Sequence, residues 1–293
     1  MPMIPGGIYK IPCDTKETQR IWGVGDVHMG ARGCHIKMLD KTITNIKNDT
    51  NAYWFGMGDM GDFHDLKHRH FTPRDIDPSI TVADMGDFGH TMQKMLLAKF
   101  LPIKTKCLGM LMGNHEYNYM VHKNDDGWHQ RFCDNMGVPN LGYTAIVKIV
   151  FQDKNSAYKA KKGITKYKKE YSYSIFLVHG AGSAASATGK KNRLIKYMNN
   201  VCTIADIYMM GHVHVLDQHI DVKLHVSPDF KDIIEHCRLG VITGTYLKTY
   251  TNGSLPSYGE KNGYDPTALG SPAITIVPET GRIGVENDLK KQL

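Results

Sequence analysis

The stretch AYWFGMGDMGD, residues 52–62, joins a short apolar run to a turn that carries glycines and two carboxylates, Asp59 and Asp62. The run is too short for an ordinary helix and predicts a buried strand over Ala52 to Met57. Glycine on either side of an acid permits a tight backbone and the close approach of a bulky ligand. A phosphate or a metal pair is such a ligand, so we expect the chain to gather around Asp59.

Four other stretches repeat this pattern of an apolar run followed at once by Asp, Asn or His. They are IWGVGDVH (21–28), LGMLMGNHE (108–116), SIFLVHG (174–180) and DIYMMGHVH (206–214). Open α/β sheets bind ligands at the carboxyl ends of their strands. Five such strand ends therefore predict one shared crevice.

The first half of the chain predicts alternating strands and helices. Gln19 to Val24 is expected to be the first strand, and the strand, helix, strand order up to Met57 predicts a parallel crossover. Apolar residues at three- and four-residue spacing predict the helices. The further expected elements are helices over His35–Asn48, from a cap at Asp84 to about Phe100, and over Asp125–Met136, and a strand over Lys104–Met112.

From Tyr143 the hydrophobic period changes to two. TAIVKIVFQ (144–152) and YSYSIFLV (171–178) predict antiparallel strands of a second sheet, joined by a lysine-rich loop over 153–170. A helix over Lys190–Asn199, a strand over Asp206–Met210 and mostly short strands up to Glu286 are expected to follow. No repeat or linker interrupts the chain, so we predict a single α/β domain over residues 1–293.

Composition predicts a soluble globular protein. Of the 293 residues, 41% are hydrophobic, which is enough for a sizeable core. No uncharged apolar run approaches the length of about 18 residues that a membrane span needs, and the start lacks the pattern of a signal peptide. We therefore expect a cytoplasmic protein without membrane contact. The six cysteines show no CxxC spacing, which favours reduced thiols over disulfides or a zinc finger.

Two pairs of residues predict metal ligands. Asp26 and His28 are two residues apart, and His212 and His214 share that spacing. Imidazole and carboxylate together suit Zn, Mn, Fe or Ni better than Ca or Mg. A lone histidine after a strand is usually structural, but these pairs combine with three further candidates into seven ligands: Asp26, His28, Asp59, Asn114, His179, His212 and His214. One shared carboxylate would then give each of two ions four ligands, as two-metal sites for attack on phosphorus require.

The motifs also match a known family in their order along the chain. They read Asp26-Val27-His28, Gly58-Asp59-Met60-Gly61-Asp62, Gly113-Asn114-His115-Glu116, His179-Gly180 and Gly211-His212-Val213-His214. The calcineurin-like metallophosphoesterases carry the signatures DxH, GDxxD, GNHE or GNHD, a lone His, and GHxH. Over residues 26–214 the chain therefore resembles this family.

The resemblance implies a four-layer α/β/β/α sandwich of two mixed sheets and two divalent metal ions, with Mn expected and Fe, Zn or Ni as alternatives. It implies two ligand sets that share one carboxylate: Asp26, His28, Asp59 and His214, and Asp59, Asn114, His179 and His212. A metal-bridging hydroxide would attack the phosphoester in line. His115 would protonate the leaving oxygen, with Asp62 as its carboxylate partner.

Two alternatives stay open on the residues themselves. The tetrapeptide MGDF occurs at residues 60–63 and again at 85–88, so Asp87 competes with Asp59 for the bridging role. Asp59 is favoured because it follows an apolar strand, whereas Asp87 falls in the first turn of a predicted helix. The histidines at positions 64, 68 and 70 form either a third metal site or, as we prefer, a solvated loop that touches substrate.

The basic residues bear on the substrate. The net charge is +7, and residues 148–170 hold eight lysines and two acids, while GKKNRLIK at 189–196 adds four basic residues. Both blocks are expected near the His179 strand. With tyrosines interleaved, four lysines are expected to bind a single-stranded nucleic acid or a nucleotide, unless they only form a solvated hairpin tip: Lys161, Lys162, Lys168 and Lys169.

Two further stretches bear on the same question. The Tyr- and Gly-rich segment 245–266 is expected to border the substrate groove or to form a surface loop. Phe63-His64 stands where the protein Ser/Thr phosphatases of the superfamily carry Arg-Gly. We therefore predict a phosphodiesterase or nuclease; a phosphomonoesterase acting on a small molecule or phosphoprotein, or a non-catalytic metal-binding scaffold, is the alternative.

Overall fold

Two large mixed β-sheets face each other in the computed structural model, which describes residues 4–63, 72–160, 164–182, 186–251, 256–261 and 263–287. The six-stranded sheet has the order β1 (Ile4–Cys13), β5 (Thr144–Asp153), β8 (Glu170–Val178), β9 (Ile207–Met210), β11 (Ile233–Thr243) and β10 (Leu216–Val226). The five-stranded sheet has the order β13 (Arg282–Asn287), β12 (Pro272–Val277), β2 (Gln19–Val24), β3 (Ala52–Met57) and β4 (Cys107–Leu111). The expected mixed α/β class is thus confirmed.

The remaining elements connect these strands. The α-helices are α1 (Ile36–Asn48), α2 (Val82–Gly86), α3 (Phe88–Phe100), α4 (Asn114–Lys123), α5 (Trp128–Met136), α6 (Ala187–Lys196) and α7 (Tyr258–Lys261). Shorter helical turns cover Pro73–Asp75, Leu101–Lys106, Lys154–Ser156, Tyr197–Val201 and Pro278–Thr280. A small hairpin of β6 (Ala157–Lys159) and β7 (Thr165–Tyr167) lies within the lysine-rich loop.

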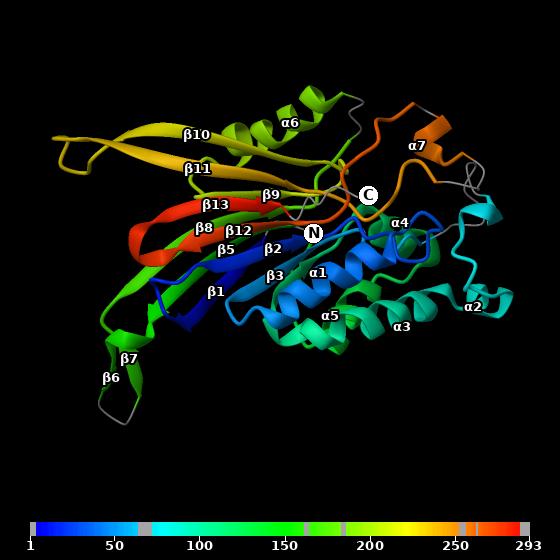
Figure 1. The fold of residues 1–293 in the computed structure, drawn as a ribbon, viewed down its shortest axis with the longest axis horizontal. Helices are drawn as coiled ribbons and strands as arrows, with labels where there is room; N and C mark the ends of the chain where they lie inside the picture. The colour runs from blue at the N-terminus through cyan, green and yellow to red at the C-terminus, as the bar shows by residue number, and fades with distance from the viewer. Residues whose placement is uncertain are drawn as a thin grey trace.

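Three apolar clusters give the layers. The outer face of the five-stranded sheet packs against α1, α3 and α5 through residues such as Leu39, Leu96 and Phe132. The two sheets enclose a second cluster, which includes Phe55 and Ile175. On the outer face of the six-stranded sheet, α6 and the π-helical turn that follows it form the third cluster. Figure 1 shows α6 on one side of the sheets and α1, α3 and α5 on the other, so the layers run helices, sheet, sheet, helix.

The strand pairings agree with two of the sequence predictions. β2, β3 and β4 are parallel neighbours, so the strand, helix, strand unit at the start is a parallel crossover. β5 and β8 pair antiparallel from Thr144 with Val178 to Gln152 with Glu170. The carboxyl end of β8 and the lysine-rich loop therefore lie at opposite ends of this pair.

Other predictions need correction. Gln19–Val24 is the second strand rather than the first, because β1 precedes it; the Pro and Gly residues of IPGGIYKIPC hide the strand pattern. The single helix expected from Asp84 is two helices: Thr81 caps α2 in a capping box with Asp84, and Asp87 caps α3.

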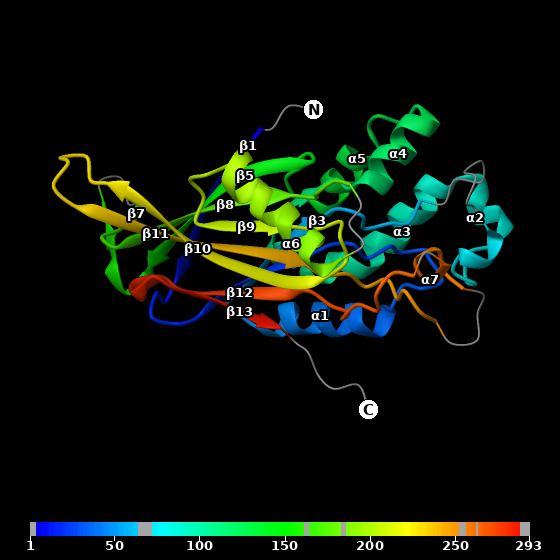
Figure 2. The ribbon, with the colours of Figure 1, turned by 90° about the horizontal axis from the view of Figure 1, so that it is seen from above.

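Three further elements differ from expectation. α4 lies in a stretch that was expected to be polar and without a helix. Only Glu116 and Met120 of this helix are buried, so few apolar residues recur at helical spacing. β10 and β11 have 11 residues each instead of being short. Together they form a hairpin that extends beyond the rest of the sandwich (Figure 2). In the described part of the chain, no helix is long and apolar enough to cross a membrane.

Candidate metal centre

The carboxyl ends of strands from both sheets meet at one place. Asp26 and His28 follow β2, Asp59 follows β3, Asn114 begins α4 after β4, His179 follows β8, and His212 and His214 follow β9. Side-chain contacts and shared donor groups link all seven of these predicted ligands. The five motifs thus form one site.

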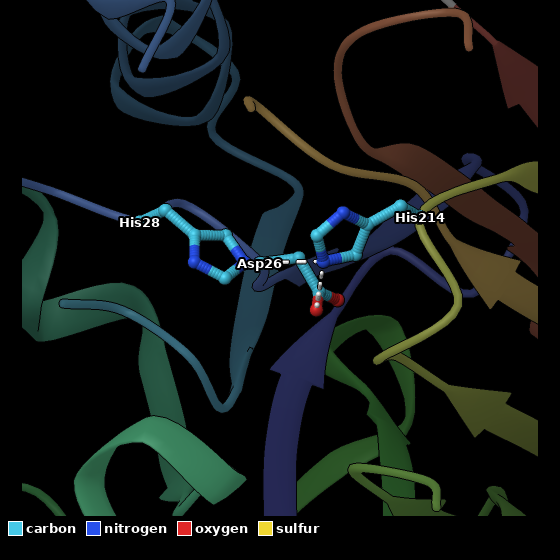
Figure 3. Close-up of side chains that lie close together, drawn as sticks. All are labelled: Asp26, His28 and His214. Atoms are coloured by element: carbon cyan, nitrogen blue, oxygen red, sulfur yellow. Dashed lines mark hydrogen bonds and ion pairs between the residues drawn. The ribbon is translucent and has the colours of Figure 1, made fainter. Parts of the chain in front are cut away.

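Asp26, His28 and His214 make up the first donor group (Figure 3). The Nε2 atom of His214 lies 3.2 Å from Asp26 Oδ1 and 3.1 Å from Nε2 of His28. Nδ1 of His28 lies 3.2 Å from a carboxylate oxygen of Asp62, which only accepts, so Nδ1 carries the proton. The lone pair of His28 Nε2 is therefore directed at the group.

Asp59, His179 and His212 make up the second donor group. His179 Nδ1 lies 2.7 Å from the carbonyl oxygen of Met57 and must donate to it, which leaves the lone pair on Nε2. That Nε2 atom is 3.2 Å from Asp59 Oδ2 and 3.1 Å from Asn114 Oδ1. The Nε2–H of His212 donates to the backbone carbonyl of Gly182 at 3.1 Å. The lone pair of His212 is therefore on Nδ1, where it can bind a metal ion.

These donors fit divalent metal ions. Lone pairs that face one another at about 3 Å repel unless a cation or proton lies between them. Burial lowers the pKa of His179, but the Asp59 carboxylate outweighs it and raises the pKa to about 9. Burial likewise raises the pKa of Asp59, and the charges of His179 and His115 bring it well below its ordinary value. Imidazole, carboxylate and amide oxygen together suit transition metals.

Asp59 occupies the shared position. Donor atoms of His28, Asp59 and His115 form a third group within 4.8 Å of one another, so Asp59 belongs to two of the three groups found among the described residues. Asp87, the alternative, is exposed, and its carboxylate accepts the backbone N–H of His90 at the start of α3. Asp59 therefore lies among the candidate ligands, whereas Asp87 caps a helix away from them.

The backbone at the site is held in an unusual conformation. Seven non-glycine residues in the described ranges have positive φ, and five are candidate ligands: Asp26, His28, Asp59, His212 and His214. Such conformations cost on the order of 1–3 kcal/mol each and persist only where the surroundings enforce them. Backbone bonds do so here, because the Asp59 carbonyl accepts from the N–H groups of Val27 and His28.

A buried carboxylate that the sequence left without a role supports these turns. Glu116 is 1% exposed and accepts backbone N–H bonds from four residues at 2.7–3.3 Å: Asp59, Met60, Gly61 and Gly113. It thereby ties the turn after β3 to the start of α4. The sequence signal was its place three residues after the helix N-cap Gly113, the acid position of a capping box.

His115 and Asp62 form a pair at the edge of the site. His115 Nδ1 lies 2.9 Å from Asp62 Oδ1, and the imidazole is one-third exposed. Burial lowers the pKa of His115, but the charges of Asp59 and Asp62 outweigh it and raise the pKa to about 10. The imidazole is thus protonated at neutral pH. The same carboxylate oxygen of Asp62 bonds His28, so one group orients both histidines.

The structure does not bring Lys168 and Lys169, the two predicted lysines within the described residues, to this site. Lys168 and Lys169 lie at the opposite end of β8 from His179, and nine strand residues at about 3.3 Å each separate the two ends by roughly 30 Å. Lys168 Nζ lies 6.0 Å from the centre of the Tyr158 ring, and Lys169 pairs with Glu279. Lys161 and Lys162 lie outside the described residues, as do His64, His68 and His70.

The second basic block lies closer to the site. Arg193 of α6 donates to the carbonyl of Ala181 at 2.8 Å, next to Gly182, whose carbonyl accepts from His212. Lys191 instead pairs with Asp217. Both blocks were expected near the His179 strand: the lysine-rich loop adjoins its start, and α6 lies near its carboxyl end.

The segment that begins at Thr245 supports the site from behind. The hydroxyl of Thr245 and the N–H of Tyr246 both donate to the backbone carbonyl of Asp26, at 2.9 and 3.0 Å. The Tyr246 hydroxyl is buried against Thr42 and Ser271. Thr245 and Tyr246 are thus buried and support the turn that carries Asp26.

Neither a comparison with models of protein families nor one with curated proteins finds a match for this chain.

Gly113 offers a direct test of the packing at the site. A Cβ atom at this position would lie 2.1 Å from Asp59 Oδ1 and 2.2 Å from Asp59 N. We expect Gly113→Ala to displace Asp59 and to lose most bound metal, measured by elemental analysis of the reconstituted protein. Gly86→Ala is the matched control, since its Cβ meets nothing within 4 Å. Equal metal content in both variants would contradict the proposed geometry.

Proposed function

We propose that the protein is a dinuclear metal-dependent phosphoesterase with the calcineurin-like fold. The observation that carries this proposal is the position of Asp59, which belongs to two donor groups, one with His28 and His115 and one with His179 and His212. Its two carboxylate oxygens have separate contacts, since Oδ2 faces His179 and Oδ1 accepts the His115 N–H. A single carboxylate so placed suits a pair of ions rather than one.

The two ligand sets that the motif resemblance implies draw on these donor groups. Asp26, His28, Asp59 and His214 would bind one ion, and Asp59, Asn114, His179 and His212 the other. When bound, such ions activate water for in-line attack on phosphorus and offset charge on the phosphoryl oxygens. Manganese is the expected metal, with iron, zinc or nickel as alternatives.

His115 would act as the general acid. Its Nδ1 atom is engaged by Asp62, so the Nε2–H is free to be given to the leaving oxygen of the ester. The Asp62 carboxylate would fix the ring orientation and stabilise the imidazolium before the proton leaves. Metal ions on Asp59 would offset part of the charge that raises the pKa of His115, which makes the proton easier to transfer.

A phosphodiester of a nucleic acid or nucleotide is the favoured substrate. Phe63 follows Asp62 where the protein phosphatases of the superfamily carry arginine, and its ring is buried against Tyr119 and Trp128, with centroid distances of 4.7 and 4.6 Å. That position therefore offers no cation to a phosphoprotein. Phosphomonoester hydrolysis, or metal binding without turnover, are the competing functions.

Metal stoichiometry tests the dinuclear centre. We expect two ions per chain after reconstitution with Mn²⁺, and Asp59→Asn should weaken both sites together because both use that carboxylate. Asp87→Asn is the matched control, since Asp87 lies in the duplicate MGDF segment but only caps α3. Elemental analysis that shows one ion or fewer in the wild type would rule out the proposed centre.

Turnover of His115→Ala tests the general acid. Proton transfer contributes about 10²–10⁴ in rate, so we expect a loss in that range on an unactivated ester and a much smaller loss on an activated aryl ester. Metal content should stay near wild type, because alanine keeps the backbone N–H that bonds Asp59. Asn118→Ala, an exposed change on the same helix, is the control. Equal losses on the two esters would refute the role.

A substrate panel tests the preference for diesters. With Mn²⁺ present, we expect cleavage of single-stranded DNA or RNA, a cyclic dinucleotide or bis(p-nitrophenyl) phosphate in preference to a phosphomonoester. Only a nucleic acid long enough to reach about 30 Å from the metal centre can contact the lysine-rich hairpin. The double variant Lys168→Ala/Lys169→Ala should therefore weaken the binding of long single-stranded nucleic acids alone and reduce the salt dependence of that binding. Cleavage of the monoester alone would reverse the substrate assignment.

A further inference from the structure

Within the described residues, no strand pairs with the outer edge of β10, and the β10–β11 hairpin extends past the rest of the sandwich (Figures 1 and 2). β10 is the last strand of its sheet, and β9 pairs only with residues Leu239–Ile242 of β11. Residues 233–238 of β11 and their partners on β10 therefore form a two-stranded ribbon. Such ribbons are only marginally stable in water without a third strand.

One face of this ribbon is apolar and exposed. Ile220, Val222, Leu224 and Val226 alternate with polar residues along β10 and are 66, 47, 66 and 53% exposed. Ile233 lies on the same face because it pairs with Val226. At the base of the hairpin that face carries Leu239, which is buried between the two sheets. The inner, apolar face of the six-stranded sheet thus continues along the hairpin, beyond the part that the five-stranded sheet covers.

The edge lacks two of the usual protections against strand pairing, a bulge and a proline, although it carries Asp217, Asp221 and Lys223. The β10–β11 register runs without a bulge from Leu216 to Val226, and β10 contains no proline. Proteins normally interrupt exposed edges with bulges, prolines or several charges. A long, regular and half-apolar edge is therefore suited to pairing with another strand.

We propose that β10 pairs antiparallel with β10 of a second copy of this chain, about a two-fold axis at Val222. Val222 then lies opposite Val222, Ile220 opposite Leu224, and Asp221 opposite Lys223 of the second copy. The apolar residues share one face, and on the other face Lys223 meets Asp221, which also pairs with Arg238 of its own chain. Asp221 and Lys223 already share a face within one chain, with an N···O distance of 3.9 Å.

The side-chain pattern favours a two-fold axis at a residue of the apolar face over an axis at a neighbouring charged residue. A shift of one residue would place apolar side chains beside polar ones. Moving the axis to Asp221 or to Lys223 would place that residue opposite its own copy, and like charges directly opposite are destabilising. The strand is thus complementary to itself about Val222, which is the property that an interface between identical chains requires.

Sedimentation velocity over a range of concentrations tests the dimer. We expect a monomer–dimer equilibrium in the wild type, and Val222→Lys should weaken it by about 100-fold or more, since two ammonium groups would meet on the axis. Val201→Lys is the control, because Val201 is equally exposed, at 48%, on another element. Lys223→Glu, a change outside the apolar face, should also weaken the dimer.

Cysteine cross-linking tests the alignment. Because Val222 faces Cys237 of its own chain, the variants carry Cys237→Ser. Val222→Cys should form a disulfide-linked dimer on mild oxidation, whereas Gln218→Cys, which would face Val226, should not. A monomeric wild type, larger open-ended assemblies, a dimer that persists in folded Val222→Lys, or equal cross-linking of both cysteine variants would each overturn the proposal.

Discussion

The buried carboxylate of Glu116 is the contact on which the site depends. A carboxylate that is buried away from water is tolerated only when its oxygens accept hydrogen bonds. Four backbone N–H groups donate to the Glu116 carboxylate. Three belong to the turn after β3 and one to the residue before α4. The requirement to satisfy one acid therefore fixes two loops relative to each other, and with them Asp59, Asn114 and His115.

A second constraint acts through glycine. Gly58, Gly113 and Gly211 each leave space that a donor group of the site occupies: a Cβ atom would lie under 3 Å from His179, Asp59 and Asp26 respectively. The left-handed backbone at the ligands and the close approach at these glycines have one cause. Five strands end within a small volume, and each must turn sharply to present its side chain there.

Much of this arrangement was predictable because it is local in the sequence. The run before Asp59 is apolar and short, so strand β3 and its carboxylate could be placed, and α1 followed from the spacing of Leu39, Ile43 and Ile46. The ligand set followed from motif spacing. α4 escaped prediction because few of its residues are buried, and β1 because its glycines and prolines weaken the strand pattern.

What could not be predicted depends on contacts between distant residues. Glu116, for example, accepts from the backbone of Asp59, Met60 and Gly61, which lie more than 50 positions away in the sequence. Likewise, the bonds from Thr245 and Tyr246 to Asp26 join residues more than 200 positions apart. No local pattern marks Tyr246 as a buried support rather than as part of a surface loop.

The candidate metal ligands come from both β-sheets, and this has a consequence for the stability of the fold. Each proposed ion would take ligands from both sheets: Asp26 and His28 with His214 at one site, and Asp59 with His179 and His212 at the other. An ion bound there cross-links the two halves of the sandwich. At a free metal concentration 1,000 times the dissociation constant, binding adds about 4 kcal/mol to the free energy of unfolding. The metal supply would then decide how firmly the two sheets stay together.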